Sequence, residues 1–206
     1  MSEQTIATKP TGRRGRPPGR GVARKHELMD RAAELMAERG FEGTSMRDIA
    51  GAVGLLPGSL YYHFPSKEDL LLAIHARVVA AMEDRVRLAL ESVSAPWDRL
   101  CAAARAHAAG LIETGNLTAI LSPDFAHRSE DLAGQLVAHR HDYEAIFRQL
   151  FDDLPLQPQV DRTLLRLQLL GGLNWIPVWF KAEGGRDVDA VADGFVETLR
   201  LAYAAT

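Results

Sequence analysis

The stretch SMRDIAGAVGLLPGSLYYHFPSK, residues 45–67, predicts two short helices joined by a tight turn. Ser45 can cap the first helix, because its hydroxyl can accept a hydrogen bond from the free backbone N–H of Asp48, whose side chain can bond to the backbone of Ser45 in return. The apolar residues that follow recur at the i, i+3, i+4, i+7 spacing of one helix face: Met46, Ile49, Ala50 and Val53. The segment is therefore expected to start a helix directly after Ser45.

A turn and a second helix are predicted by Gly54 and Pro57. Gly54 follows the last apolar position, where a residue without a Cβ can adopt the left-handed conformation. Pro57 fits the first turn of a helix, where its missing N–H costs nothing, and Pro65 ends that helix after residues 58–63. The second helix has little apolar surface for a core but carries polar and aromatic side chains: Ser59, Tyr61, Tyr62 and His63. Such a helix suits a surface that another molecule covers, as in a helix-turn-helix that reads DNA.

These residues give the chain a resemblance to the TetR/AcrR family of transcriptional repressors. The match covers roughly residues 24 to 75 and rests on an ordered set: Gly40-Phe41, Thr44-Ser45, Ile49-Ala50, Gly54, Gly58, Leu60-Tyr61, His63-Phe64 and Ser66-Lys67. The resemblance implies an all-α fold with an N-terminal three-helix head and a C-terminal helical body for ligand binding and dimerisation. One departure is Leu56, where the family often has a small hydroxyl residue that caps the second helix. Pro57 is expected to compensate by fixing φ.

The resemblance also implies which side chains of the head contact DNA. Arg47 matches a position that reaches a base edge, and the alternative is an exposed arginine that holds a phosphate. Lys67 is expected to hold a phosphate together with the free N–H groups at the start of the following helix. The other expected contacts are Ser45, Ser59, Tyr61, Tyr62 and His63. A competing interpretation packs one ring into the head, Tyr61 in preference to Tyr62.

The formal net charge of −3 conceals a basic N-terminus on an acidic body. Residues 1–25 contain seven basic side chains and Glu3 as their one acidic side chain, whereas the remainder has 17 basic and 26 acidic residues. Residues 1–21 are also rich in Gly, Pro, Thr and Arg and predict a disordered arm. A basic arm on an acidic body indicates nucleic acid as the partner at one end of the molecule.

Arg14-Gly15-Arg16-Pro17, within this arm, resembles the core of an AT-hook. That motif lays an extended backbone in a narrow minor groove, where arginine gains from the enhanced negative potential of A/T-rich DNA. Arg14 and Arg16 are therefore candidate DNA contacts. The alternative is a basic tail that touches phosphates without sequence preference.

Length and composition allow one compact domain or two small ones, since 47% of the 206 residues are hydrophobic and helix formers dominate. An all-α fold is expected, because β-branched residues do not alternate with polar ones. No stretch reaches the roughly 20 apolar residues of a membrane span, and the one cysteine excludes an intramolecular disulfide. A cytoplasmic protein with no membrane contact is the expectation. The expected domains are the arm (1–21), the helix-turn-helix domain (22–68) and the ligand-binding and dimerisation domain (69–206).

Helical periodicity continues through the rest of the chain. Residues 24–39 predict the first helix of the head, and Ser66 with Asp69 forms a second capping box that opens a long helix. Five further helices are expected in the body: one from Trp97 to Gly115, a short one at about 117–121, one from Leu132 to Leu150, and a last pair at 159–181 and 187–204. Pro177 is expected to kink the first helix of that pair.

The segment LLGGLNWIPVWFK, residues 169–181, predicts a dimer interface. Small residues let two backbones approach closely, and large aromatic residues supply contact area. In the family that the chain resembles, the last two helices pair with their copies as a four-helix interface. The candidate interface residues are Gly171, Gly172, Trp179 and Phe195. A competing interpretation places one tryptophan in the ligand cavity.

A cavity for a small, mainly apolar ligand is expected in the body, because this part of the chain combines many apolar residues with few buried charges. The candidate lining residues, which plain core packing would also explain, are Leu111, Phe125, Tyr143, Phe147 and Trp175. Asn174-Trp175 and Trp179-Phe180 look like a subgroup of the family that responds to acyl-coenzyme A (acyl-CoA) thioesters. The phosphates of coenzyme A would need a basic rim, with the candidates Arg105, Arg128, Arg140 and Arg148. The alternative is a promiscuous cavity for lipophilic drugs.

Enzymatic and metal-binding functions are not expected. His139 and His141 lie two apart on different helix faces, so they do not form a helical metal pair. Cys101 is predicted to face inward, where a thiol is usually inert, and no cofactor is expected. The predicted function is therefore a homodimeric repressor that binds a palindromic operator in double-stranded DNA and is released by its ligand. The alternatives are an activator without a ligand and a small-molecule binder or enzyme with a vestigial head.

Overall fold

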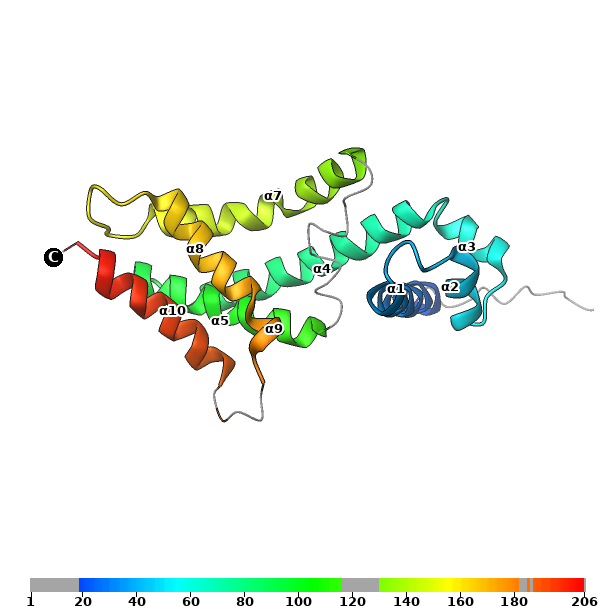
Figure 1. Cartoon of the computed structure of the whole chain (residues 1–206), viewed down its shortest axis with the longest axis horizontal. Coiled ribbons are helices and arrows are strands. Elements are labelled where there is room, and N and C mark those ends of the chain that lie inside the picture. Colours follow the sequence, from blue (N-terminus) through cyan, green and yellow to red (C-terminus); the bar gives the residue numbers. More distant parts are fainter. Residues whose placement is uncertain (1–18, 116–129, 182–184, 186, 206) are drawn as a thin grey trace, which may run out of the picture.

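The computed structural model describes residues 19–115, 130–181, 185 and 187–205. These residues form an elongated molecule with a small helical head at one end and a larger helical body at the other (Figure 1). The described helices are α1 (Gly19–Arg39), α2 (Met46–Ala52), α3 (Pro57–His63), α4 (Lys67–Leu90), α5 (Pro96–Thr114), α7 (Glu130–Asp152), α8 (Arg162–Asn174), α9 (Ile176–Trp179) and α10 (Val188–Tyr203).

The predicted fold class is confirmed: an all-α protein with a helix-turn-helix head and a helical body. Within the described residues, the one β-type contact is an isolated bridge between Leu156 and Ala204. No helix in this part of the chain has the length and apolar character needed to span a bilayer.

The helix-turn-helix consists of α2 and α3. Ser45 Oγ accepts a hydrogen bond from Asp48 N at 3.2 Å, and Ser45 N donates to Asp48 Oδ2 at 3.0 Å, which makes the predicted capping box. Gly54 has a φ of +64°, a conformation that residues with a Cβ rarely adopt. α3 starts with Pro57 in its first turn and without a capping hydrogen bond from the Leu56 side chain. These local predictions are confirmed.

The core of the head is formed by α1, α2, α3 and the first half of α4. Its most deeply buried side chains include Met36, Ile49, Leu60 and Leu70. Leu132 and Leu136 of α7 belong to the same apolar cluster. The head core therefore extends to a helix of the body.

α4 connects the head with the body and is 24 residues long, which corresponds to about 36 Å. Ser66 Oγ accepts a hydrogen bond from Asp69 N at 2.9 Å and caps this helix. Its apolar side chains at helical spacing are all buried: Leu70, Ile74, Val78, Met82 and Val86. The first three belong to the core of the head and the last two to the core of the body. One helix thus contributes to both cores.

In the body, α5 packs against both α4 and α10, while α7 and α8 cover the same core (Figure 1). Phe147 and Phe151 of α7, Leu100 of α5 and Leu173 of α8 are completely or almost completely buried. Gly110 brings α5 close to α4, because a Cβ there would lie 2.4 Å from Met82 Sδ. A movement of α5 would therefore press directly on α4.

α1 begins at Gly19, before the predicted start at residue 24. Residues 19–21, predicted as part of the arm, are thus helical, and the helix starts directly after Pro18, the last proline before residue 57. The rest of the predicted arm lies outside the described residues, as does the short helix predicted at about 117–121.

The helix predicted at 159–181 is broken rather than kinked, so this prediction is wrong. α8 ends at Asn174, Trp175 forms the junction, and the short helix α9 follows. Pro177 explains the break, because it has no N–H to donate to the carbonyl of Leu173 and its ring would clash with that carbonyl.

Candidate nucleic-acid interface and sites in the body

The helix-turn-helix presents an exposed polar and aromatic face. Arg47 on α2 and Ser59 on α3 are exposed. Tyr62 is 85% exposed and Tyr61 is 49% exposed. His63 is also exposed, and its ring lies edge-on to that of Tyr62 at a centroid distance of 5.4 Å. Tyr61 is thus the more buried of the two tyrosines. The structure brings these five candidate DNA contacts onto two adjacent helices.

The back of α3 holds it against the head. Leu60 is completely buried, and Phe64, directly after the helix, is 4% exposed. Phe64 N donates to Leu60 O at 2.9 Å, and Lys25 Nζ lies 5.2 Å from the centroid of the Phe64 ring. Apolar packing therefore fixes the position of α3 and leaves its polar face available to a partner.

The side chain of Ser45 is largely used by its own helix cap. Besides accepting from Asp48 N, Ser45 Oγ donates to Asp48 Oδ2 at 2.5 Å. Hydrogen bonds from the Ser45 side chain and backbone, with a smaller contribution from the charge of Arg39, hold the pKa of the Asp48 carboxyl below its ordinary value. A DNA contact by the Ser45 hydroxyl would compete with this cap.

The ammonium group of Lys67 is held inside the head. Its Nζ donates to Phe41 O at 2.6 Å and to Thr44 O at 3.0 Å, and it lies 4.2 Å from the centroid of the Phe41 ring. Two of its three donors are therefore bound to the turn between α1 and α2. The phosphate contact expected for Lys67 would have to use the remaining donor or break these bonds.

Thr44 joins the same turn to α1, a role that the sequence analysis did not anticipate. Thr44 is 1% exposed, and its Oγ1 lies 3.1 Å from Leu35 O and 2.9 Å from Gly40 O. The signal that could have found it is a threonine directly before the cap of α2, where a hydroxyl can bond to nearby backbone. Together, Thr44 and Lys67 fix the entry to the helix-turn-helix.

The residues predicted to line a ligand cavity do not form one group. Leu111, Tyr143 and Phe147 are buried in the core of the body, whereas Trp175 is 62% exposed. Tyr143 and Phe147 pack edge-to-face at a centroid distance of 5.7 Å. Phe125 lies outside the described residues. Trp175 is thus placed on the surface, since it follows α8 at the helical spacing of the exposed residues Leu164 and Gly171.

His107 on α5 is buried at the centre of a hydrogen-bonded chain that the sequence pattern did not predict. Its Nδ1 is 2.5 Å from the Tyr143 hydroxyl on α7, and its Nε2 is 3.0 Å from Asn174 Oδ1 at the end of α8. Burial lowers the pKa of His107 to about 4, and burial also raises the pKa of Tyr143. Both groups are therefore neutral at physiological pH.

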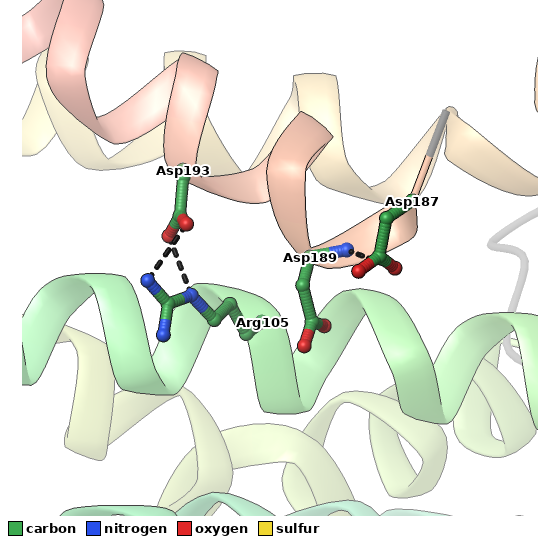
Figure 2. A network of polar contacts seen from close by, with 4 residues as sticks. All are labelled: Arg105, Asp187, Asp189 and Asp193. Atoms are coloured by element: carbon green, nitrogen blue, oxygen red, sulfur yellow. Dashed lines mark hydrogen bonds and ion pairs between the residues drawn. The ribbon is translucent and has the colours of Figure 1, made fainter. Parts of the chain in front are cut away.

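Arg105, a predicted rim residue, is paired with a carboxylate in the structure. Its Nε and Nη2 bind Asp193 Oδ1 and Oδ2 at 2.6 and 2.7 Å, and Asp187 and Asp189 lie at the start of α10, the helix that carries Asp193 (Figure 2). The hydrogen bond from Arg105 to Asp193 raises the pKa of the arginine. Arg105 also borders an open groove of about 380 Å³ between α4 and α5, together with Arg85 and Asp189. Because Arg85 is paired with Glu113, the groove carries no excess positive charge for coenzyme A phosphates.

The other predicted rim residues lie in different surroundings. Arg148 Nη2 donates to His141 O at 3.3 Å, and Arg140 is half-buried at the joint between α4 and α7. At this joint His75 of α4 is 1% exposed and faces His139 of α7 at a ring centroid distance of 5.5 Å. Burial, with smaller contributions from Arg140 and His139, lowers the pKa of His75 to about 4. Arg128 lies outside the described residues.

α8 and α9 present an exposed apolar face, to which we give the name α8–α9 face. It consists of Leu164, Leu167, Trp175, Val178 and Trp179, which are 43% to 65% exposed. Gly171 has open space where a Cβ would be, whereas a Cβ on Gly172 would lie 3.4 Å from the ring of Phe195. Gly172 and Phe195 therefore contact each other within one chain, while Gly171 remains open to a partner.

Two family descriptions match the sequence. "Bacterial regulatory proteins, tetR family" matches residues 28–74, and "Tetracyclin repressor-like, C-terminal domain" matches residues 93–202. The HTH-type transcriptional repressor KstR2 of Rhodococcus jostii is 30% identical over 190 residues, which cover 85% of this chain and 89% of that repressor. KstR2 of Mycolicibacterium smegmatis is 27% identical over 186 residues, covering 87% and 90% of the two chains.

One solved structure with a similar fold contains both a coenzyme A thioester and DNA. AibR, crystallised in complex with isovaleryl coenzyme A and operator DNA, superimposes with a TM-score of 0.73 at 28% sequence identity. The match covers 85% of the present chain and 97% of AibR. The likeness therefore includes the head, the connecting helix and the body together.

Proposed function

The chain belongs to the TetR family of bacterial regulatory proteins, and we propose that it is a repressor that binds a palindromic operator as a homodimer and leaves it on binding an acyl-CoA thioester. The observation that carries the DNA-binding part is the exposed face of α2 and α3, with Arg47, Ser59, Tyr61, Tyr62 and His63. The similarity to repressors over most of the chain supports repression rather than activation.

In the DNA complex, α3 lies in the major groove and α2 supports it. Arg47 reads a guanine through its guanidinium, and Ser59 meets a base edge with a hydroxyl that can donate or accept. Tyr61, Tyr62 and His63 place rings with polar tips against the sugar-phosphate backbone and thymine methyl groups. Lys67 and Ser45 act mainly behind this surface, where their hydrogen bonds hold the entry to α2 and α4.

The α8–α9 face supports dimerisation. Exposed apolar patches of several neighbouring side chains mark interaction sites in soluble proteins, and here five large apolar residues lie on two consecutive helices and the junction between them. A stable dimer needs about 1,200–2,000 Å² of buried surface, so α10 is expected to contribute, for example through Leu201, which is 79% exposed. Two heads then meet half-sites about 34–36 Å apart, or a multiple of that spacing.

The effector is inferred to be an acyl thioester. The core of the body is almost entirely apolar and suits an acyl tail, and the similar repressor AibR was crystallised with isovaleryl coenzyme A. Arg105 is not proposed as the phosphate site, because Asp193 already neutralises it.

Release from DNA is expected to pass through α4. A ligand that spreads the body helices moves α5, which is in close contact with α4 at Gly110, and α7, whose Leu132 and Leu136 reach the core of the head. The ligand must bind the released state more tightly, typically by about 1–3 kcal/mol.

The decisive experiment measures operator binding and release. DNA from upstream of the gene is footprinted with the purified protein, and the protected fragment is titrated in a gel shift with isovaleryl-, octanoyl- and palmitoyl-CoA and with the free acids. Protection of a palindrome and release by a thioester but not by its acid are expected. Protection that no thioester relieves would reject the effector, and no specific protection would reject the DNA-binding part.

A further inference from the structure

The chain Tyr143–His107–Asn174 connects the interior of the body with its surface. Tyr143 and His107 are 9% and 4% exposed, whereas Asn174 is an exposed residue at the last position of α8. Among the described residues of the body core, His107 is the one buried histidine, and both of its ring nitrogens are hydrogen-bonded. The three residues come from α7, α5 and α8, so the chain also joins three helices.

The direction of each hydrogen bond follows from elementary chemistry. Asn174 Oδ1 can only accept, so His107 Nε2 carries the proton and donates at 3.0 Å. A neutral imidazole has one N–H, so its Nδ1 accepts the proton of the Tyr143 hydroxyl. The two bonds are consistent with each other: with the proton on Nε2, Nδ1 accepts from Tyr143 and the oxygen of the Asn174 amide is turned toward the ring.

The fixed amide orientation has a consequence for the surface. With Oδ1 turned toward His107, the NH₂ group of Asn174 points away from the ring, and it makes no hydrogen bond to another described residue. It presents two N–H donors and no acceptor at the boundary between the apolar core and solvent. A carbonyl oxygen is the natural partner for such a group.

In an acyl-CoA molecule the thioester carbonyl lies at the comparable junction, between an apolar tail and a polar head. Its acyl tail belongs in the apolar core, its large charged nucleotide belongs in solvent, and the thioester lies between them. A carbonyl that left water without finding a donor would be strongly disfavoured.

Resting on the proposed thioester effector, we propose that the Asn174 amide donates the hydrogen bond that recognises the thioester carbonyl. His107 and Tyr143 are positioning residues, which keep the donors of Asn174 turned toward the ligand. The site selects a hydrogen-bond acceptor at the junction of an apolar tail and a polar head.

The test removes the carbonyl from the ligand and the donor from the protein in turn. The probe pair is the acyl-CoA that wild type binds most tightly, among isovaleryl-, octanoyl- and palmitoyl-CoA, and its alkyl thioether analogue with CH₂ in place of C=O. Dissociation constants are measured by calorimetry for wild type and for Asn174→Ala. Gln168→Ala, which removes an exposed amide from the same helix, is the matched control.

Wild type and Gln168→Ala should bind the thioester about tenfold more tightly than the thioether. Asn174→Ala should bind both about equally, with its thioether affinity and its operator affinity unchanged. Among the positioning residues, His107→Leu and Tyr143→Phe should reduce the preference, whereas His107→Gln should retain much of it because its amide N–H can still donate to Asn174. Because Asn174 is exposed, its variant is informative even if a His107 variant fails to fold.

Several outcomes would overturn the proposal. The first is an undiminished preference for the thioester in Asn174→Ala, which would leave the proposed effector intact. The second is a variant that loses dimerisation in sedimentation while keeping that preference, which would assign Asn174 to the interface instead. If wild type binds no thioester, both the effector and this site are rejected.

Discussion

Arg47 is the side chain whose removal should separate base reading from general attraction to DNA. Because it is exposed on α2, Arg47→Ala should leave the melting temperature nearly unchanged. It should cost about 1–3 kcal/mol on the specific operator and relax discrimination at one base position. Gel shifts on specific and scrambled operators measure this, with Arg87→Ala on α4 as a control of equal charge change. Equal losses on both DNAs would instead make Arg47 a phosphate contact.

Lys67 should matter for the stability of the head before it matters for DNA. Lys67→Met keeps the aliphatic stem on the Phe41 ring but removes the hydrogen bonds to Phe41 O and Thr44 O. The free energy of unfolding should fall by about 1–3 kcal/mol, as measured by urea titration. Lys25→Met is the matched control, since Lys25 lies 5.2 Å from an aromatic centroid. An unchanged unfolding curve with weakened binding to all DNA would return Lys67 to the role of phosphate contact.

Two buried histidines should make stability depend on pH. Burial lowers the pKa values of His75 and His107 to about 4, whereas an unfolded histidine titrates near 6.5. Between these values the unfolded chain binds more protons, so stability is complete above about pH 6.5 and falls as the pH drops toward 4. The slope is at most about 1.4 kcal/mol per pH unit for each histidine.

Urea unfolding between pH 4.5 and 7 measures this slope for wild type and for the His75→Gln and His107→Gln variants. Each substitution should flatten the curve, because glutamine does not titrate. Carboxylates contribute the same pH dependence to all three proteins, so the difference in slope between wild type and each variant comes from the substituted histidine. Curves that run parallel would show that these histidines gain protons equally in both states.

At the scale of elements, α8 and α9 carry the apolar surface that the C-terminal part offers to a partner. The exposed side of α8 and the residue after it carries Leu164, Leu167 and Trp175, and all three are more than half exposed. Leu167→Glu should therefore convert the proposed dimer into a monomer in sedimentation velocity, since a buried unpaired charge is strongly unfavourable. Leu88→Glu, at another exposed leucine, on α4, should remain dimeric. Identical sedimentation of wild type and both variants would remove the α8–α9 face from the interface.

The sequence predicts those elements whose causes are local. Ser45, Gly54 and Pro57 act within one or two turns of their own position, and the structure has the cap, the turn and the helix start at these residues. The prediction of one kinked helix over residues 159–181 is wrong, because the helix ends at Asn174, three residues before Pro177. A proline inside a helix pattern is compatible with either a kink or a break, and the sequence alone does not distinguish the two results.

The roles that the sequence did not predict depend on distant partners. Lys67 meets Phe41 across 26 positions, and His107 meets Asn174 across 67. A lysine at a helix start and a histidine on an apolar face carry no local sign of such partners. Arg105 is similar, since its neutralisation by Asp193 comes from α10, 88 positions further along. Contacts of this kind depend on how helices pack, which periodicity does not specify.

At the scale of the whole molecule, charge and shape favour the same orientation on DNA. The head lies at one end of the elongated fold, with α1 beginning at Gly19 (Figure 1). The preceding residues carry Lys9, Arg13, Arg14 and Arg16, while the chain as a whole is negative. An acidic body is repelled by DNA, so the basic N-terminal region and the head are the parts that can approach it.

Deleting residues 2–17 tests whether this region adds affinity through charge. Each phosphate that it neutralises should contribute about 0.9 to the slope of log affinity against log salt on duplex DNA. Up to four basic side chains are removed with the deletion, so the slope should flatten by a few units. The melting temperature should stay nearly constant, because the core residues of the head begin at Leu28. An Arg14 and Arg16 contact in the minor groove further requires a larger loss on operators with A/T-rich flanks. Equal salt slopes for the full-length and shortened proteins would exclude the region from the DNA complex, and equal losses on all flanks would reduce it to a non-specific tail.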